Sequence, residues 1–261
     1  MLGAIAGDII GSVYEHHNVL SKQFELFSPE ACFTDDTVLT VALADSLLLG
    51  TPYLDNLIMY YNRYPDAGFG GYFVRWVASG DKCPYNSFGN GSAMRVSPVG
   101  FAFNDLDRIL REAEKSASVT HNHPEGIKGA QATAAAIWHA RQKHAKMDMQ
   151  SYIETTFGYD LSRRLDDIRP VYKYNETCQG SVPEAIIAFL ESTDFEDAIR
   201  NAISIGGDSD TLACITGGIA EAFYGGVPRT ILDFVYGKLD GSLTEIINQF
   251  IVRFEVPRES E

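Results

Sequence analysis

Apolar residues recur at helical spacing along most of the chain. In the segments 124–141, 208–226 and 241–254 they return every three or four residues and line one face. Runs of alternating β-branched residues, which are typical of strands, are almost absent. No linker rich in proline or serine and no repeat of solenoid length interrupts the pattern. The chain is therefore predicted to form one all-α, multi-helix domain over residues 1–261.

The segment 33–50, FTDDTVLTVALADSLLLG, has a different pattern. Its apolar residues spread around the whole circumference of a helix, which is typical of a buried helix. Two adjacent acids, Asp35 and Asp36, stand where this helix begins. Burying one carboxylate costs several kcal/mol unless a partner compensates its charge, and burying two side by side costs more. The pattern therefore raises the question of what compensates these two acids.

Two stretches lack a regular period. The stretch 62–92 is dense in Gly, Asn, Tyr and Phe, and it is predicted to be loop with one short helix. The stretch 168–183, IRPVYKYNETCQGSVP, is predicted to be irregular.

Charge and cysteine content exclude some classes of function. The 261 residues carry a formal net charge of −14, and binding to nucleic acid needs concentrated Lys and Arg, so nucleic acid is expected only as a modified substrate. The four cysteines form no CxxC pair, which disfavours a disulfide framework or a thiolate zinc site. No segment has the length and apolarity of a membrane span, and the N-terminus lacks the basic region of a signal peptide. We expect a cytoplasmic monomer with no membrane partner.

A second acidic cluster follows a Gly-Gly pair in SIGGDSDTLA, residues 204–213. Asp208, Asp210 and Thr211 open a helix with an apolar face, just as Thr34, Asp35 and Asp36 open the first one. Asp and Thr are favoured helix N-caps, so capping is one interpretation of both clusters. Capping needs one side-chain oxygen, however, and each cluster supplies three. Oxygen ligands without His or Cys suit Mg²⁺, Mn²⁺ or Ca²⁺, so a hard-metal site is the second interpretation. The spacing excludes an EF-hand.

Four further features are open to two interpretations each. Glu15 closes the Gly-rich opening GAIAGDIIGSVYE and, alone, is typical of a surface acid, whereas Asp8 in the same opening is predicted to be a cap or a core hydrogen-bonding residue. The loops 67–71 and 85–95 contain glycines that allow a ligand to approach the backbone, although each is also typical of a plain turn. His121 is two residues from a second histidine but has no third zinc ligand nearby, so a hydrogen bond to substrate or to a loop carbonyl is predicted.

Together these motifs resemble the ADP-ribosylglycohydrolase family, which includes the bacterial enzyme that reactivates dinitrogenase reductase and its animal relatives. The matching motifs are GAIAGDIIGSVYE, FTDDT, SFGNGSAMRVSPVG, THNHPEG and GGDSDT, which follow the family's order from residue 3 to about residue 224. The combination of GDxxG…E, TDDT and GGDxDT is specific to the family.

The resemblance implies a compact all-α fold with a binuclear centre of two Mg²⁺ or Mn²⁺ ions in a central cleft. The family's metal ligands match Thr34, Asp35, Asp36, Asp208, Asp210 and Thr211. Its mobile active-site glutamate matches Glu15, and Asp35 and Asp36 are further candidates for proton transfer. Its ADP-ribose-binding residues match Gly68, Phe69, Gly70, Gly71, Tyr85, Ser87, Phe88, Gly89, Asn90, Gly91 and His121. Many relatives carry Tyr at the position of Phe88. The phenylalanine ring can still stack on a ligand, but it cannot form the hydrogen bond of a phenol.

The implied activity is metal-dependent hydrolysis of the bond at the anomeric ribose carbon of ADP-ribose. Cleavage builds oxocarbenium-like charge on the ribose, and metal ions can acidify a water molecule. The expected partner is an ADP-ribosylated protein or an ADP-ribose-containing small molecule, and the acceptor linkage is left open. The alternatives are a non-catalytic ADP-ribose-binding or structural member of the family, and a two-metal nucleotide phosphohydrolase.

Overall fold

The computed structural model describes residues 1–255, and their regular structure is helical with no β-strand. The first half contains α1 (Leu2–Gly11), α2 (Asp35–Leu49), α3 (Tyr53–Arg63), α4 (Gly71–Ala78), α5 (Gly91–Met94), α6 (Ser97–Ala102), α7 (Leu106–Ala117) and α8 (Pro124–Arg141). The second half contains α9 (Lys146–Phe157), α10 (Leu165–Ile168), α11 (Cys178–Leu190), α12 (Phe195–Ile203), α13 (Ser209–Tyr224), α14 (Arg229–Tyr236), α15 (Gly241–Phe250) and a π-helical turn, Ile251–Glu255. The all-α prediction is confirmed.

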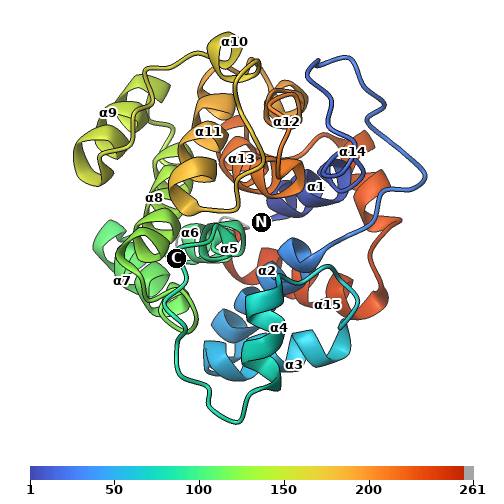
Figure 1. The fold of residues 1–261 in the computed structure, drawn as a ribbon, viewed down its shortest axis with the longest axis vertical. Coiled ribbons are helices and arrows are strands. Elements are labelled where there is room, and N and C mark those ends of the chain that lie inside the picture. The colour runs from blue at the N-terminus through green and yellow to red at the C-terminus, as the bar shows by residue number, and fades with distance from the viewer. Residues whose placement is uncertain (256–261) are drawn as a thin grey trace, which may run out of the picture.

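Helix α13 lies at the centre of the fold. Every residue from Ser209 to Glu221 is buried, and α13 packs against α1, α8, α11 and α12 (Figure 1). Helix α2 is buried from Asp36 to Ser46, as its pattern predicted. Its last residue, Leu49, is 70% exposed, so the burial ends with the helix. The two helices that begin with acidic clusters are therefore both core helices.

Glycines at every fourth position allow α1 to pack directly on α13. Gly3, Gly7 and Gly11 face α13, and a Cβ atom on Gly7 would lie 2.0 Å from the carbonyl oxygen of Ala213. A Cβ on Gly11 would lie 2.6 Å from the Cα of Asp210. The backbones of the two helices therefore touch, and this contact fixes the end of α1 beside the beginning of α13.

We expect Gly7→Ala to lower the free energy of unfolding by about 3 kcal/mol, because the new methyl group has to displace helix backbone instead of a flexible side chain. Urea denaturation measures the change. Gly241→Ala is the matched control, since nothing lies within 4 Å of the added Cβ, and we expect a change below about 0.5 kcal/mol. Equal stability of the two variants would contradict the proposed close packing.

The structure follows most of the predicted element boundaries. The segments 124–141, 208–226 and 241–254 correspond to α8, to α13 with its N-cap Asp208 and its left-handed Gly225 cap, and to α15 with the π-helical turn. The stretch 62–92 is mainly loop around the short helix α4. No helix among residues 1–255 is both long enough and apolar enough to span a bilayer.

The prediction for 168–183 is wrong in its last part, because α11 already begins at Cys178. Thr177 caps this helix by accepting a hydrogen bond from the Gly180 N–H at 3.1 Å. Cys178 and Val182 are fully buried, whereas the letters CQGSVP show no helical stripe and include Pro183 inside the helix. The cap and tertiary packing therefore stabilise a turn of helix that local pattern does not indicate.

Candidate active site

Asp8 organises the first acidic helix start. The N-cap residue of α2 is Thr34, whose hydroxyl accepts a hydrogen bond from the Asp36 N–H at 3.3 Å. Asp8, on α1, accepts hydrogen bonds from the N–H and the hydroxyl of both Thr34 and Thr37. These four contacts confirm that Asp8 is a core hydrogen-bonding residue. Asp8 and Thr34 therefore satisfy the backbone N–H groups at the beginning of α2, and the side chains of Asp35 and Asp36 are not needed as caps.

The second acidic helix start follows two glycines in the left-handed region. Gly206 has φ +78° and Gly207 φ +70°, and a Cβ on Gly207 would lie 2.7 Å from the ring of Tyr172. Asp208 occupies the N-cap position of α13, but its side chain makes no capping hydrogen bond. It accepts a hydrogen bond from the Asn90 amide at 2.7 Å instead. The capping interpretation is therefore wrong for Asp208.

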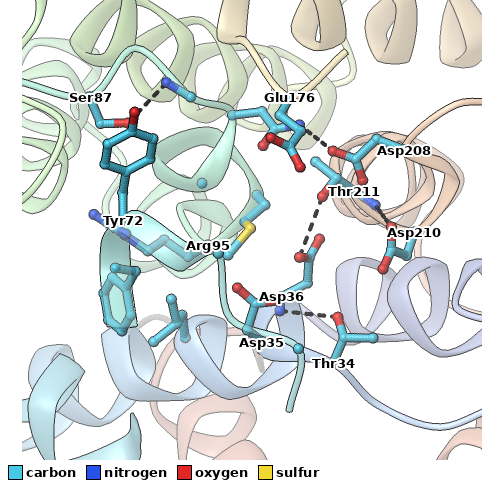
Figure 2. Close-up of a pocket in the computed structure, with 18 of the residues that line it drawn as sticks. Thr34, Asp35, Asp36, Tyr72, Ser87, Arg95, Glu176, Asp208, Asp210 and Thr211 are labelled. Atoms are coloured by element: carbon cyan, nitrogen blue, oxygen red, sulfur yellow. Dashed lines mark hydrogen bonds between the residues drawn. The ribbon is translucent and has the colours of Figure 1, made fainter. Parts of the chain in front are cut away.

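The two helix starts meet at one cavity of about 270 Å³ (Figure 2). Thr211 Oγ1 donates to Asp36 Oδ1 at 3.4 Å and links α13 to α2. One carboxylate oxygen from each of Glu15, Asp208 and Asp210 lies within 4.8 Å of the other two. The six residues that the sequence suggested as metal ligands all line this cavity together with Glu15: Thr34, Asp35, Asp36, Asp208, Asp210 and Thr211.

Burial raises the pKa of the aspartates in this cluster. The pKa of Asp35 is raised to about 8, first by burial and then by the charges of Asp8 and Asp208. The pKa values of Asp36 and Asp210 are raised well above the usual range by burial and by neighbouring carboxylates. The charge of the buried Arg95 acts on Asp35 in the opposite direction, but burial and the neighbouring carboxylates outweigh it.

The donor set of the cluster fits a hard divalent cation. Asp36 Oδ2 is buried and has no hydrogen-bond partner among residues 1–255. Carboxylate and hydroxyl oxygens are the ligands that Mg²⁺, Mn²⁺ and Ca²⁺ take in proteins. A divalent cation would offset the mutual repulsion of the aspartates, and the unpartnered Asp36 oxygen could coordinate it.

Two glycine-containing loops form the other side of the cavity (Figure 2). The lining residues that the sequence predicted there are Gly68, Gly70 and Gly71 at the start of α4, and Tyr85, Ser87, Gly89, Asn90 and Gly91 leading into the start of α5. His121 also lines the cavity, and its Nδ1 lies 2.7 Å from Thr120 Oγ1. Burial and the nearby Arg95 charge lower the pKa of His121 well below its usual value, so its ring is neutral near neutral pH.

The side chains of Phe69 and Phe88 do not line the cavity, although both were predicted substrate contacts. Phe69 is buried and stacks on Phe73 with ring centroids 5.4 Å apart. Phe88 is 46% exposed and packs against His123 at 5.3 Å. In this conformation Phe69 anchors its loop to the core, and Phe88 lies outside the cavity.

Asn90 lines the cavity, as predicted, and it also contacts the acidic cluster. Its side chain is buried, and its amide nitrogen donates to Asp208 Oδ2 at 2.7 Å and to Ser181 Oγ at 3.0 Å. Both amide hydrogens are therefore used within the protein, and Asn90 orients an acidic side chain of the cluster.

Seven lining residues were not predicted as site residues from the sequence: Leu39, Tyr72, Phe73, Met94, Arg95, Tyr174 and Glu176. Arg95 is fully buried, and its guanidinium donates to Thr120 Oγ1 at 2.8 Å. Tyr174 and Glu176 come from the stretch 168–183, and the Tyr174 hydroxyl lies 3.0 Å from Oε1 of both Glu15 and Glu176. The only local signal for these two residues is the aromatic pair YKY in a segment without period.

Comparison with known proteins identifies the family and the fold of the chain. A family model described as ADP-ribosylglycohydrolase matches residues 1–259. The human protein "ADP-ribosylhydrolase ARH3" is 27% identical over 305 residues, covering 86% of this chain and 84% of its own. "Putative ADP-ribosyl glycohydrolase L543" of Acanthamoeba polyphaga mimivirus is 26% identical, covering 90% and 89%. A solved structure, "ADP-ribosylglycohydrolase-related protein complex", has the same fold, with a TM-score of 0.75 at 24% identity over 97% of this chain and 95% of that one. The chain belongs to the ADP-ribosylglycohydrolase family.

Proposed function

We propose that this protein is a divalent-cation-dependent hydrolase that cleaves the glycosidic bond at the anomeric ribose carbon of ADP-ribose. It would release ADP-ribose from a modified acceptor, either a protein side chain or a small molecule. The observation that carries the proposal is the cluster of buried aspartates, which shares one cavity with two glycine-containing loops. The family membership of the chain supports it.

The acidic side chains would hold the cations. The ligands would be Thr34, Asp35, Asp36, Asp208, Asp210 and Thr211, holding two Mg²⁺ or Mn²⁺ ions, with Glu15 next to Asp208 and Asp210. Bound ions of this kind supply Lewis acidity and orient hydroxyl groups of the substrate.

The remaining residues of the cavity have separate tasks in this proposal. Backbone N–H groups of the loops that contain Gly70 and Gly89 would bind the pyrophosphate, because consecutive N–H groups form an anion-binding concavity. Neutral His121 would hydrogen-bond a ribose hydroxyl. The Glu15 carboxylate, which reaches the cavity from an irregular segment, would move the proton between water and the leaving group.

The test is release of free ADP-ribose from arginine-linked, serine-linked and O-acetyl substrates, each with Mg²⁺ and again with EDTA. Cation-dependent release from any of them would support the proposal and identify the acceptor. Release that continues undiminished in excess EDTA would refute the cation requirement. Release of inorganic phosphate would favour the two-metal phosphohydrolase, and tight ADP-ribose binding without turnover would favour a non-catalytic member of the family.

We expect Asn90→Ala to weaken Mn²⁺ binding by about 10-fold to 100-fold, since it removes the amide that orients Asp208. Electron paramagnetic resonance of free Mn²⁺ measures the affinity. The exposed Asn62 provides the same substitution outside the cavity, and Asn62→Ala is expected to bind Mn²⁺ like the unmodified protein. Unchanged affinity in Asn90→Ala would show that Asp208 does not depend on this hydrogen bond.

A further inference from the structure

Glu15 lies on a segment without regular structure. Residues 12–34 connect α1 to α2 and contain no helix, and they form the long loop that extends from α1 in Figure 1. The Glu15 side chain is only partly buried, with 23% of its surface exposed. Its carboxylate nevertheless lies within 4.8 Å of the carboxylates of Asp208 and Asp210 at the start of α13. Some contact must therefore fix this segment relative to α13.

Asn18 makes that contact with four hydrogen bonds. Its amide nitrogen lies 2.7 Å from the Tyr14 carbonyl oxygen, 2.8 Å from that of Glu15 and 3.1 Å from that of Gly207. Its amide oxygen accepts a hydrogen bond from the Gly207 N–H at 2.7 Å. Both polar backbone groups of Gly207 are therefore bound by one side chain, which also holds the backbone of Glu15.

Gly207 connects this hydrogen-bonded contact to the acidic start of α13. Gly207 immediately precedes Asp208, and its left-handed conformation turns the chain into α13. The same amide thus spans the residue before Asp208 and the carbonyl of Glu15. At the other end of the Glu15 side chain, the Tyr174 hydroxyl lies 3.0 Å from Oε1. Asn18 fixes the backbone of Glu15, and Tyr174 contacts its carboxylate.

We infer that Asn18 is a positioning residue, which holds Glu15 against Asp208 and Asp210 and so completes this group of carboxylates. The inference rests on the proposed function only in treating the group as a cation site. The contact itself predicts slow amide exchange at Gly207, whether or not a cation is bound, because the Gly207 N–H is hydrogen-bonded to Asn18.

The experiment compares Asn18→Ala with Gln23→Ala, which removes an exposed amide side chain from the same segment. Hydrogen–deuterium exchange is read at Gly207 and at residues 12–18 in EDTA. Mn²⁺ affinity is read by electron paramagnetic resonance in the unmodified protein and in a Glu15→Gln background. We expect Asn18→Ala to accelerate exchange at both places and to weaken Mn²⁺ binding about tenfold. In the Glu15→Gln background, we expect Asn18→Ala to have little further effect, because Asn18 acts through Glu15.

Two results would overturn the inference. One is unchanged exchange and unchanged Mn²⁺ affinity in Asn18→Ala. The other is the same loss of affinity in both backgrounds, which would mean that Asn18 acts on the fold independently of Glu15. If the unmodified protein does not bind Mn²⁺ at all, the proposed function fails on its own, and the exchange measurement still decides whether Asn18 holds the segment to Gly207.

Discussion

Replacing Asp36 with asparagine is expected to lower turnover by about 10²-fold to 10³-fold, the loss typical for removing one preorganised electrostatic group from an active site. The same change is expected to stabilise the metal-free protein by about 2 kcal/mol near neutral pH. Both effects have one cause. Asp36 is 2% exposed, one of its oxygens has no hydrogen-bond partner among residues 1–255, and three nearby carboxylates, those of Asp8, Asp35 and Asp208, raise its pKa further. Asparagine keeps the shape and removes the charge.

The two effects are measured by the rate of ADP-ribose release and by urea denaturation in EDTA. Asp45→Asn is a matched control, because Asp45 is 5% exposed on the same helix, accepts a hydrogen bond from Tyr60 at 3.1 Å and does not line the cavity. Its turnover is expected to equal that of the unmodified protein. Full activity of Asp36→Asn would refute the role of the cluster in catalysis. A metal-free variant less stable than the unmodified protein would contradict the destabilising effect of the buried Asp36 carboxylate.

The stability of the metal-free protein is expected to fall as the pH rises from about 5 to about 8. The folded-state pKa of Asp35 is raised to about 8, and the pKa values of Asp36 and Asp210 are also raised. The folded state therefore binds more protons than the unfolded state over this range, so the free energy of unfolding decreases with pH. Each carboxyl that loses its proton only in the unfolded chain contributes a slope of up to about 1.4 kcal/mol per pH unit.

A divalent cation is expected to reverse this loss. Cations compete with protons for the same oxygens, so Mg²⁺ or Mn²⁺ should stabilise the protein most at the upper end of the range. At a concentration of about 100 times the dissociation constant, binding contributes about 2.7 kcal/mol, which raises the melting temperature of a chain of this size by about 5–10 °C. Thermal melts in EDTA and in Mg²⁺, at matched ionic strength, test this expectation. A free energy of unfolding that stays constant or rises with pH in EDTA would contradict it.

Both acidic helix starts could be recognised from the sequence because their information is local. Thr34, Asp35 and Asp36 stand ahead of a run that is apolar all round, and Asp208 and Asp210 follow a Gly-Gly turn. Helical periodicity is a property of neighbouring residues, so α8, α13 and α15 were predicted with nearly the observed bounds. Asp8 could be assigned to the core because a charged residue inside an apolar helix needs hydrogen-bond partners. The order of the family motifs along the chain indicated the family.

Tertiary structure alone decided how these parts meet. The two acidic helix starts are more than 170 positions apart, and they come together because the glycine face of α1 touches α13 while Asp8 of α1 holds the start of α2. The orientations of Phe69, Phe88 and Asn90 were likewise not predictable, since a loop pattern does not show which side chains turn inward. Asn18 carries no local signal, and Tyr174 carries only the aromatic pair YKY, because their importance comes from contacts with residues distant in the chain, Gly207 and Glu15. By itself, the sequence determined the all-α class, the approximate bounds of α2, α8, α13 and α15, and which acids need a partner. The close contact of helix backbones and the hydrogen bonds between distant loops decided which of those acids share one cavity.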